Sequence, residues 1–126
     1  MLSVIALVCI TSYTDCTKSN IEIIDGDSIV VRSKGFEEEF RILGIDAPEI
    51  KGHCKRESAL AQMAKQRLMT MLKKRAVNIR RYEEDKYGRT LATLEVNNSF
   101  IGNKLIEEGL ARQWTEKWDG NRYPWC

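Results

Sequence analysis

The chain has 126 residues, of which 43% are hydrophobic and 30% are charged. This length and composition suit one compact domain with its own core, and they exclude a disordered chain. The formal net charge of +2 permits a phosphate-bearing partner, but it excludes the large basic excess of a strongly basic nucleic-acid binder.

The first fifteen residues, MLSVIALVCITSYTD, contain an apolar run over positions 4–10 and neither lysine nor arginine. This run is too short to span a bilayer, and it is typical of the hydrophobic part of a secretory signal peptide. We therefore predict a signal peptide over residues 1–15 and a single domain over residues 16–126. The alternatives are a first β-strand of the domain or a misassigned start.

Four cysteines stand at positions 9, 16, 54 and 126, and Cys9 would leave with a signal peptide. A disulfide between Cys54 and Cys126 is attractive in an oxidising compartment, because it would tie down the end of the chain. The sequence leaves the connectivity open. The spacings match no zinc signature, so zinc is not expected.

Three short β runs come next, separated by turn signals. They cover Ile21–Ile24, Ser28–Arg32 and Glu38–Ile45, and the turns between them read DGD and SKG. This order predicts a β-meander. The glutamates at positions 37–39 are expected to form a solvated edge.

The segment Glu57–Arg75 has the pattern of an amphipathic helix. Basic residues crowd its C-terminal end, where the helix dipole favours them. The apolar residues recur at i, i+3 and i+4, and this stripe is expected to pack on the core, methionines included. It consists of Leu60, Met63, Ala64, Leu68, Met71 and Leu72.

Two more strands and a short helix complete the pattern. Val77–Tyr82 and Thr90–Val96 read as strands, and residues 101–109 read as a helix with Gly109 as its C-cap. The order β-β-β-α-β-β-α is that of the OB fold. The predicted fold class is therefore α+β, a five-stranded OB-fold β-barrel with a helix inserted after strand 3 and a short C-terminal helix.

Acids and arginines gather in three segments at predicted strand ends, which a barrel could bring to one rim. The segments IDGDS, RILGIDAPE and DKYGR contribute Asp27, Arg41, Asp46, Glu49 and Arg89. Carboxylates are the hard oxygen ligands that Ca²⁺ accepts, arginine forks match phosphate oxygens, and a carboxylate such as Glu49 can accept a proton from water. Such a set can hydrolyse a phosphodiester, since preorganised cations stabilise the negative charge of the transition state.

In order and spacing, the motifs DGDS, RILGIDAPE, DKYGR and LIEEGLA resemble those of the staphylococcal nuclease (thermonuclease) family, over about residues 21–112. The resemblance implies an OB-fold enzyme that cleaves DNA and RNA with Ca²⁺ and leaves 3′-phosphorylated products. For the site it implies metal ligands Asp27, Asp46 and the Ala47 carbonyl, catalytic residues Arg41, Glu49 and Arg89, and substrate-binding residues Lys86 and Tyr87.

The chain departs from the family pattern in two places. Ala47 stands where the family often has threonine, although a backbone carbonyl ligand survives that change. The tail lacks the two tyrosines that contact the nucleotide in the best-known member. Trp114 or Trp118 could replace them as a stacking platform, or could instead cover the barrel floor.

The end of the chain, NRYPWC, resembles a shorter secreted bacterial branch of the family, in which a Cys54–Cys126 disulfide would anchor the tail. The resemblance implies a secreted or periplasmic monomer that acts on DNA and RNA, without membrane association once the signal is removed. The alternative is a catalytically silent OB-fold module that binds nucleic acid. Such relatives normally lose the acids or arginines, and none is lost here.

Overall fold

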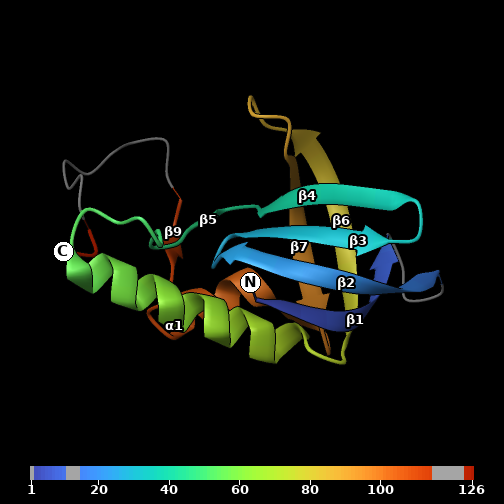
Figure 1. The fold of residues 1–126 in the computed structure, drawn as a ribbon, viewed down its shortest axis with the longest axis horizontal. Coiled ribbons are helices and arrows are strands. Elements are labelled where there is room, and N and C mark those ends of the chain that lie inside the picture. Colours follow the sequence, from blue (N-terminus) through green and yellow to red (C-terminus); the bar gives the residue numbers. More distant parts are fainter. Residues whose placement is uncertain (1, 11–14, 115–123) are drawn as a thin grey trace.

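A closed β-barrel of six strands forms the centre of the fold, as the computed structural model of residues 2–10, 15–114 and 124–126 shows (Figure 1). The strand order is β4-β3-β2-β1-β6-β7, and pairing of β4 with β7 closes the barrel. The strands are β1 Ser3–Ile10, β2 Cys16–Asp25, β3 Ser28–Ser33, β4 Phe36–Ile42, β6 Ala76–Glu84 and β7 Thr90–Val96. The predicted α+β barrel of the OB type is confirmed, with one strand more than expected.

Four short elements accompany the barrel and the long helix α1, Lys55–Leu72. Strand β8, Ser99–Phe100, extends the sheet beyond β7 and leads directly into helix α2, Ile101–Glu107. Gly109 follows α2 with a φ of +73°, at the predicted C-cap region, and this left-handed conformation favours glycine. Outside the barrel, β5 (Ile45–Asp46) and β9 (Arg112–Gln113) form a two-stranded antiparallel sheet.

The additional strand of the barrel is β1, which comes from the apolar run near the N-terminus. It pairs antiparallel with β2 and parallel with β6, so it lies between them in the sheet. Alternate side chains of β1 point into the core, and Val4, Ala6 and Val8 are buried there. The strand that the sequence left open as an alternative is thus the structure of this segment, and residues assigned to a signal peptide contain part of the core.

Helix α1, Lys55–Leu72, packs along the barrel with a face that agrees only in part with the predicted one (Figure 1). Its buried positions are Glu57, Ala61, Ala64, Leu68 and Leu72, whereas Met63 is 58% exposed. The predicted stripe was therefore partly wrong. Two alanines on the buried face let the helix approach closely, and Glu57 and Ala61 are buried in addition to the predicted Ala64, Leu68 and Leu72. Among the described residues, no helix is both long and apolar enough to cross a membrane.

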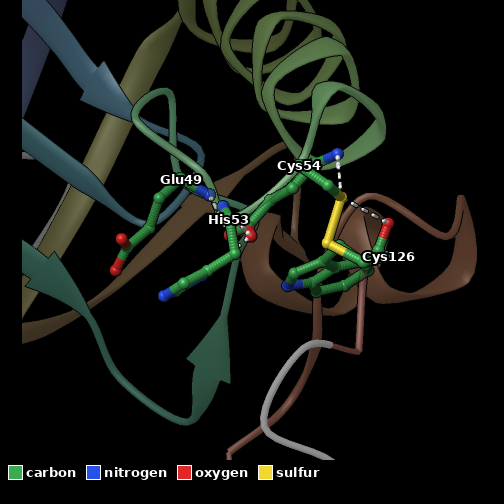
Figure 2. The surroundings of a disulfide bond; sticks show 6 residues. Glu49, His53, Cys54 and Cys126 are labelled. Atoms are coloured by element: carbon green, nitrogen blue, oxygen red, sulfur yellow. Dashed lines mark hydrogen bonds and ion pairs between the residues drawn. A yellow bond between two sulfur atoms is a disulfide. The ribbon is translucent and has the colours of Figure 1, made fainter.

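Two disulfides join segments of the described chain. Cys9 and Cys16 face each other across the β1–β2 pair. Cys54 and Cys126 are also joined, which fixes the C-terminus beside the first turn of α1 (Figures 1 and 2). The disulfide favoured from the sequence is thus present.

Of the glutamates 37–39 of β4, Glu37 and Glu39 are exposed as expected, whereas Glu38 is partly buried. Glu38 accepts hydrogen bonds from Arg81 of β6 and from Thr90 Oγ1 of β7, the latter at 2.8 Å. Glu37 accepts a hydrogen bond of 2.8 Å from Arg32 Nε. Glu38 therefore helps to hold the seam where β4 closes on β7.

Candidate functional site

The turn between β2 and β3 carries the first site residue, Asp27, and neighbouring elements enclose this turn. A side chain on Gly26 would place its Cβ 2.8 Å from the Cβ of Ala64 in α1 and 3.1 Å from that of Ala47. Only glycine fits without displacing one of them. The carbonyl of Asp27 also accepts a hydrogen bond of 2.8 Å from the backbone N–H of Ile42, at the end of β4. The turn is therefore fixed against α1 and β4.

Two neighbours contact the Asp27 carboxylate. Its Oδ2 accepts a hydrogen bond of 3.0 Å from the backbone N–H of Ala47 and lies 3.5 Å from Nη2 of Arg41. Burial raises the pKa of Asp27, and Asp25 and Asp46 add to this effect, while Arg41 and the Ala47 N–H oppose it. The charged form of this acid is thus short of compensating positive charge, which suits a site that receives a cation.

Arg41 is held at the end of β4 with its guanidinium directed at the Asp27 turn. Its Nη2 donates a hydrogen bond of 3.3 Å to the Ile45 carbonyl, in addition to the contact with Asp27. The β3–β4 register pairs Ser28 with Arg41, and this pairing places the arginine beside the turn. Local strand pairing therefore explains why residues 27 and 41 meet.

Asp46 lies in β5, one residue before Ala47, and its partner comes from the end of the described main segment. Asp46 pairs with Arg112 in the β5–β9 ladder, and its Oδ2 accepts a hydrogen bond of 3.0 Å from Arg112 Nε. Both side chains are about a quarter exposed. Arg112 was missed by the sequence analysis, since no motif relates two residues 66 positions apart.

Glu49 follows Ala47 by two positions and has an exposed side chain. Its backbone N–H donates a hydrogen bond of 3.1 Å to Oε2 of Glu57, near the start of α1. Figure 2 shows the Glu49 carboxylate directed away from the disulfide, on the same side of the loop as the outer edge of the His53 ring. Glu49 therefore faces solvent from a loop that is anchored through its backbone.

Arg89, Lys86 and Tyr87 lie on the hairpin that joins β6 to β7, beside the end of β4 (Figure 1). Arg89 Nε donates a hydrogen bond of 2.9 Å to Oδ2 of Asp85 and lies 3.9 Å from Oε2 of Glu39. Tyr87 is 72% exposed, and the charged ends of Lys86 and Arg89 lie 5.2 and 5.5 Å from its ring centre. Both distances are in the range of cation–π contacts, so the tip of the hairpin presents two basic groups around an exposed aromatic ring.

The structure thus brings part of the predicted site into direct contact and leaves part on a neighbouring element. Arg41 and Ala47 both contact Asp27, and the charge of Asp46, next to Ala47 in the chain, acts on Asp27 as well. Glu49 belongs to the same loop. The Arg89 guanidinium is turned toward Asp85 and Glu39, so it would have to exchange these partners to meet a phosphate.

Trp114 is 51% exposed, and its backbone N–H donates a hydrogen bond of 2.9 Å to the carbonyl of Gly44, in the loop before β5. The half-exposed Trp114 thus lies beside the loop that leads to Asp46, and its role as a stacking platform stays a prediction. Trp118 lies outside the described residues.

The donor set suits a hard cation that takes part of its shell from elsewhere. It offers two carboxylates and a backbone carbonyl, which are the oxygen ligands that Ca²⁺ accepts. In the described part of the chain, no three side chains of His, Cys, Asp or Glu lie close enough together to hold a metal ion by themselves. Water or substrate oxygens would have to complete the coordination.

The fold is an OB-type barrel. Its candidate site combines the carboxylates of Asp27 and Asp46 with the arginine donor Arg41. The chain belongs to the family of staphylococcal nuclease homologues, because the family model matches residues 39–123.

Relatives of this chain include proteins whose names describe nucleases. A thermonuclease of Staphylococcus hyicus is 32% identical over 82% of this chain, and one of Staphylococcus intermedius is 34% identical over 71%. A micrococcal nuclease of Shigella flexneri is 27% identical over 94% of the chain and 68% of its own length. The matches cover only 62% and 55% of the two thermonucleases.

Proposed function

We propose that this protein is a calcium-dependent nuclease that hydrolyses phosphodiester bonds in DNA and RNA. The observation that carries the proposal is the contact of the Asp27 carboxylate with Arg41 and the Ala47 N–H, next to Asp46. This arrangement joins oxygen ligands for a cation to a donor for phosphate. The names of the three relatives support the same reaction, and the family resemblance implies that the products keep the phosphate on the 3′ side.

Asp27, Asp46 and the Ala47 carbonyl would hold Ca²⁺. When bound, the ion supplies charge neutralisation at the phosphate. The raised pKa of the buried Asp27 supports this assignment, because a nearby cation would restore the charged form of the acid.

Arg41 would bind the non-bridging oxygens of the scissile phosphate. Its guanidinium is already oriented by Asp27 and the Ile45 carbonyl, so little side-chain entropy would be lost on binding. Arg89 would bind the same phosphate after leaving Asp85 and Glu39. Losing either donor is expected to reduce kcat by about 10²–10³-fold, by analogy with the loss of one oxyanion donor.

Glu49 would position the attacking water and accept its proton, which requires an exposed carboxylate near the phosphate. Its loss is expected to cost about 10²–10⁴-fold in rate. Lys86 and Tyr87, at the exposed tip of the hairpin, would contact the terminal phosphate of a bound nucleotide.

We further propose that the protein works as a monomer outside the cell or in the periplasm, without association with a membrane. Two disulfides support an oxidising compartment, since cytosolic thiols are kept reduced.

The test is the release of acid-soluble nucleotides from heat-denatured DNA and from RNA, with Ca²⁺ and then with excess EGTA. The Glu49→Gln protein is assayed beside the wild type. We expect calcium-dependent release by the wild type, loss of release in the variant, and 5′-hydroxyl product ends that a kinase labels directly. DNA binding without release by the folded, oxidised protein would contradict the proposal and favour a silent binding module.

A further inference from the structure

Glu57 is a buried acid that the proposed chemistry does not use. The residue is 4% exposed, although it lies in the first turn of α1, where most acids face water. Burying a carboxylate costs free energy unless hydrogen bonds compensate for the lost water. The hydrogen-bond partners of Glu57 therefore indicate the role of this residue.

Both oxygens of Glu57 bind the loop that carries Glu49. Oε2 accepts the hydrogen bond of 3.1 Å from the Glu49 N–H. Oε1 accepts a hydrogen bond of 2.9 Å from the His53 N–H and lies 3.3 Å from Nδ1 of the His53 ring. One side chain therefore joins the two ends of the five-residue segment 49–53.

These hydrogen bonds stabilise the charged carboxylate form of Glu57. Burial alone would raise its pKa, but the hydrogen bonds from the His53 and Glu49 N–H groups and from the His53 ring outweigh it, so the pKa lies below its usual value. A carboxylate offers acceptors on both oxygens, whereas a carboxamide offers one oxygen and a donor. A glutamine at this position would satisfy one end of the loop and oppose the other.

The packing of the loop on Glu57 is close. A Cβ on Gly52 would come within 2.7 Å of both Cβ and Cγ of Glu57, so only glycine fits there as the loop stands. On its other side, the Glu57 N–H donates to Sγ of Cys54 at 3.4 Å, and Cys54 is joined to Cys126. Figure 2 shows the Cys54–Cys126 disulfide beside the loop that carries Glu49 and His53.

We propose that Glu57 is a positioning residue that fixes the Glu49 carboxylate for the reaction by binding the backbone of its loop. The inference rests on the proposed function, in which Glu49 acts on the attacking water. Because the Glu49 side chain is exposed, the backbone of residues 49–53 decides where it points. A displacement of about 1 Å in such a group costs roughly 10²-fold in rate.

The first experiment compares Glu57→Gln with the wild type in steady-state cleavage of single-stranded DNA at saturating Ca²⁺. We expect kcat to fall by about 10- to 100-fold, while KM and the DNA dissociation constant change less than threefold. The matched control is Glu108→Gln. Glu108 is also an acid in an ion pair, since its Oε1 lies 2.7 Å from Arg67 Nε, but this pair is not part of the loop. The control should keep the wild-type kcat. Equal kcat values for the two variants would overturn the proposal.

A double variant separates positioning from a general loss of structure. In the Glu49→Gln background, adding Glu57→Gln should leave the residual rate unchanged within about twofold, since both act on one group. A further loss as large as in the wild-type background would overturn the proposal. If Glu57→Gln does not fold, Gly52→Ala displaces the same loop, and it should lower kcat in the same manner. An unchanged kcat there would equally overturn it.

Amide hydrogen exchange gives a readout that does not need activity. In Glu57→Gln, the N–H groups of Glu49 or His53 should exchange at least tenfold faster than in the wild type, with unchanged rates in the barrel strands. Unchanged exchange at both would contradict the positioning role even if the wild type proved inactive. An inactive wild type with accelerated exchange in the variant would instead disprove the nuclease proposal alone.

Discussion

Nη2 of Arg41 lies 3.5 Å from Oδ2 of Asp27, and the same oxygen accepts the Ala47 N–H at 3.0 Å. One carboxylate oxygen thus links the end of β4, the β2–β3 turn and the loop after β5. The contact that orients Arg41 is thus made with Asp27, which is itself a predicted metal ligand. A change at Arg41 is therefore expected to affect phosphate binding more than the fold.

Arg41→Lys tests this separation. Lysine keeps the charge but cannot form the planar, two-pronged contact with a phosphate, so kcat is expected to fall by about 10²–10³-fold. The melting temperature should change by only a few degrees. The comparison uses Arg32→Lys, because Arg32 pairs with Glu22 and Glu37 on the barrel. Cleavage rates are measured at saturating Ca²⁺, and a wild-type rate for Arg41→Lys would remove Arg41 from the mechanism.

The barrel, the insertion of α1 and the meeting of Asp27 with Arg41 could be predicted, because they follow from local patterns. Turn signals set the strand boundaries, and the hairpin register then places residue 28 opposite residue 41. The strand β1 could not be separated from a signal peptide, since a buried strand and a short hydrophobic leader share the same apolar composition. The structure shows this segment paired with β2 and β6, and its removal as a signal peptide stays a prediction.

The long-range partners of the site residues were not predictable for a different reason. Arg112, Glu57 and Glu38 are charged residues of a kind that usually faces solvent. Each gains its role from a residue on another element or in a loop, and hydrophobic periodicity carries no information about such pairs. The inner face of α1 was predicted only in part for a related reason, because a buried acid, Glu57, and a small alanine, Ala61, belong to it.

Arg112 and a bound cation would compete for the same carboxylate. Arg112→Gln removes the positive group at 3.0 Å from Asp46, so the apparent affinity for Ca²⁺ is expected to rise by about fivefold, which corresponds to about 1 kcal/mol. The affinity for Ca²⁺ is measured without substrate, from the rise in melting temperature as the Ca²⁺ concentration increases. Lys104→Gln removes one positive charge on α2 and controls for net charge. A weaker calcium effect in Arg112→Gln than in the wild type would show that Arg112 supports the cation site instead.

Glu38 makes the stability of the barrel seam depend on pH. The hydrogen bond from Arg81, with that from Thr90, holds the pKa of Glu38 below its usual value of 4.5 despite partial burial. For an acid with a lowered folded pKa, the stabilisation is present above the unfolded value and is lost as the pH falls through the folded one.

Glu38→Gln should therefore lower the free energy of unfolding by about 1 kcal/mol at pH 7, and the difference from the wild type should narrow as the pH falls below 4.5. Urea unfolding at several pH values measures it. Glu37→Gln is the control, because the Glu37 side chain is 65% exposed. If the difference in unfolding free energy between Glu38→Gln and the wild type stayed constant with pH, the charge of Glu38 would not be what stabilises the seam.

Removal of residues 1–15 would take β1 out of the barrel, together with Cys9 of the Cys9–Cys16 disulfide. Two buried valines, Val4 and Val8, leave the core, and each is worth about 1.5–3 kcal/mol of burial. Strands β2 and β6 would also lose the partner between them. The loss approaches the whole stability of a typical domain, about 5–15 kcal/mol.

A chain that starts at residue 16 is therefore expected to unfold at a much lower urea concentration than the full chain, or not to fold. Ile5→Thr with Leu7→Thr is the control, because these side chains are 46% and 43% exposed on the outer face of β1 and threonine suits a strand. The control should keep the barrel intact. A shortened chain as stable as the full one would show that β2 and β6 close the barrel without β1, as removal of a signal peptide requires. The mass of the protein recovered from a secreting host then identifies which form is made.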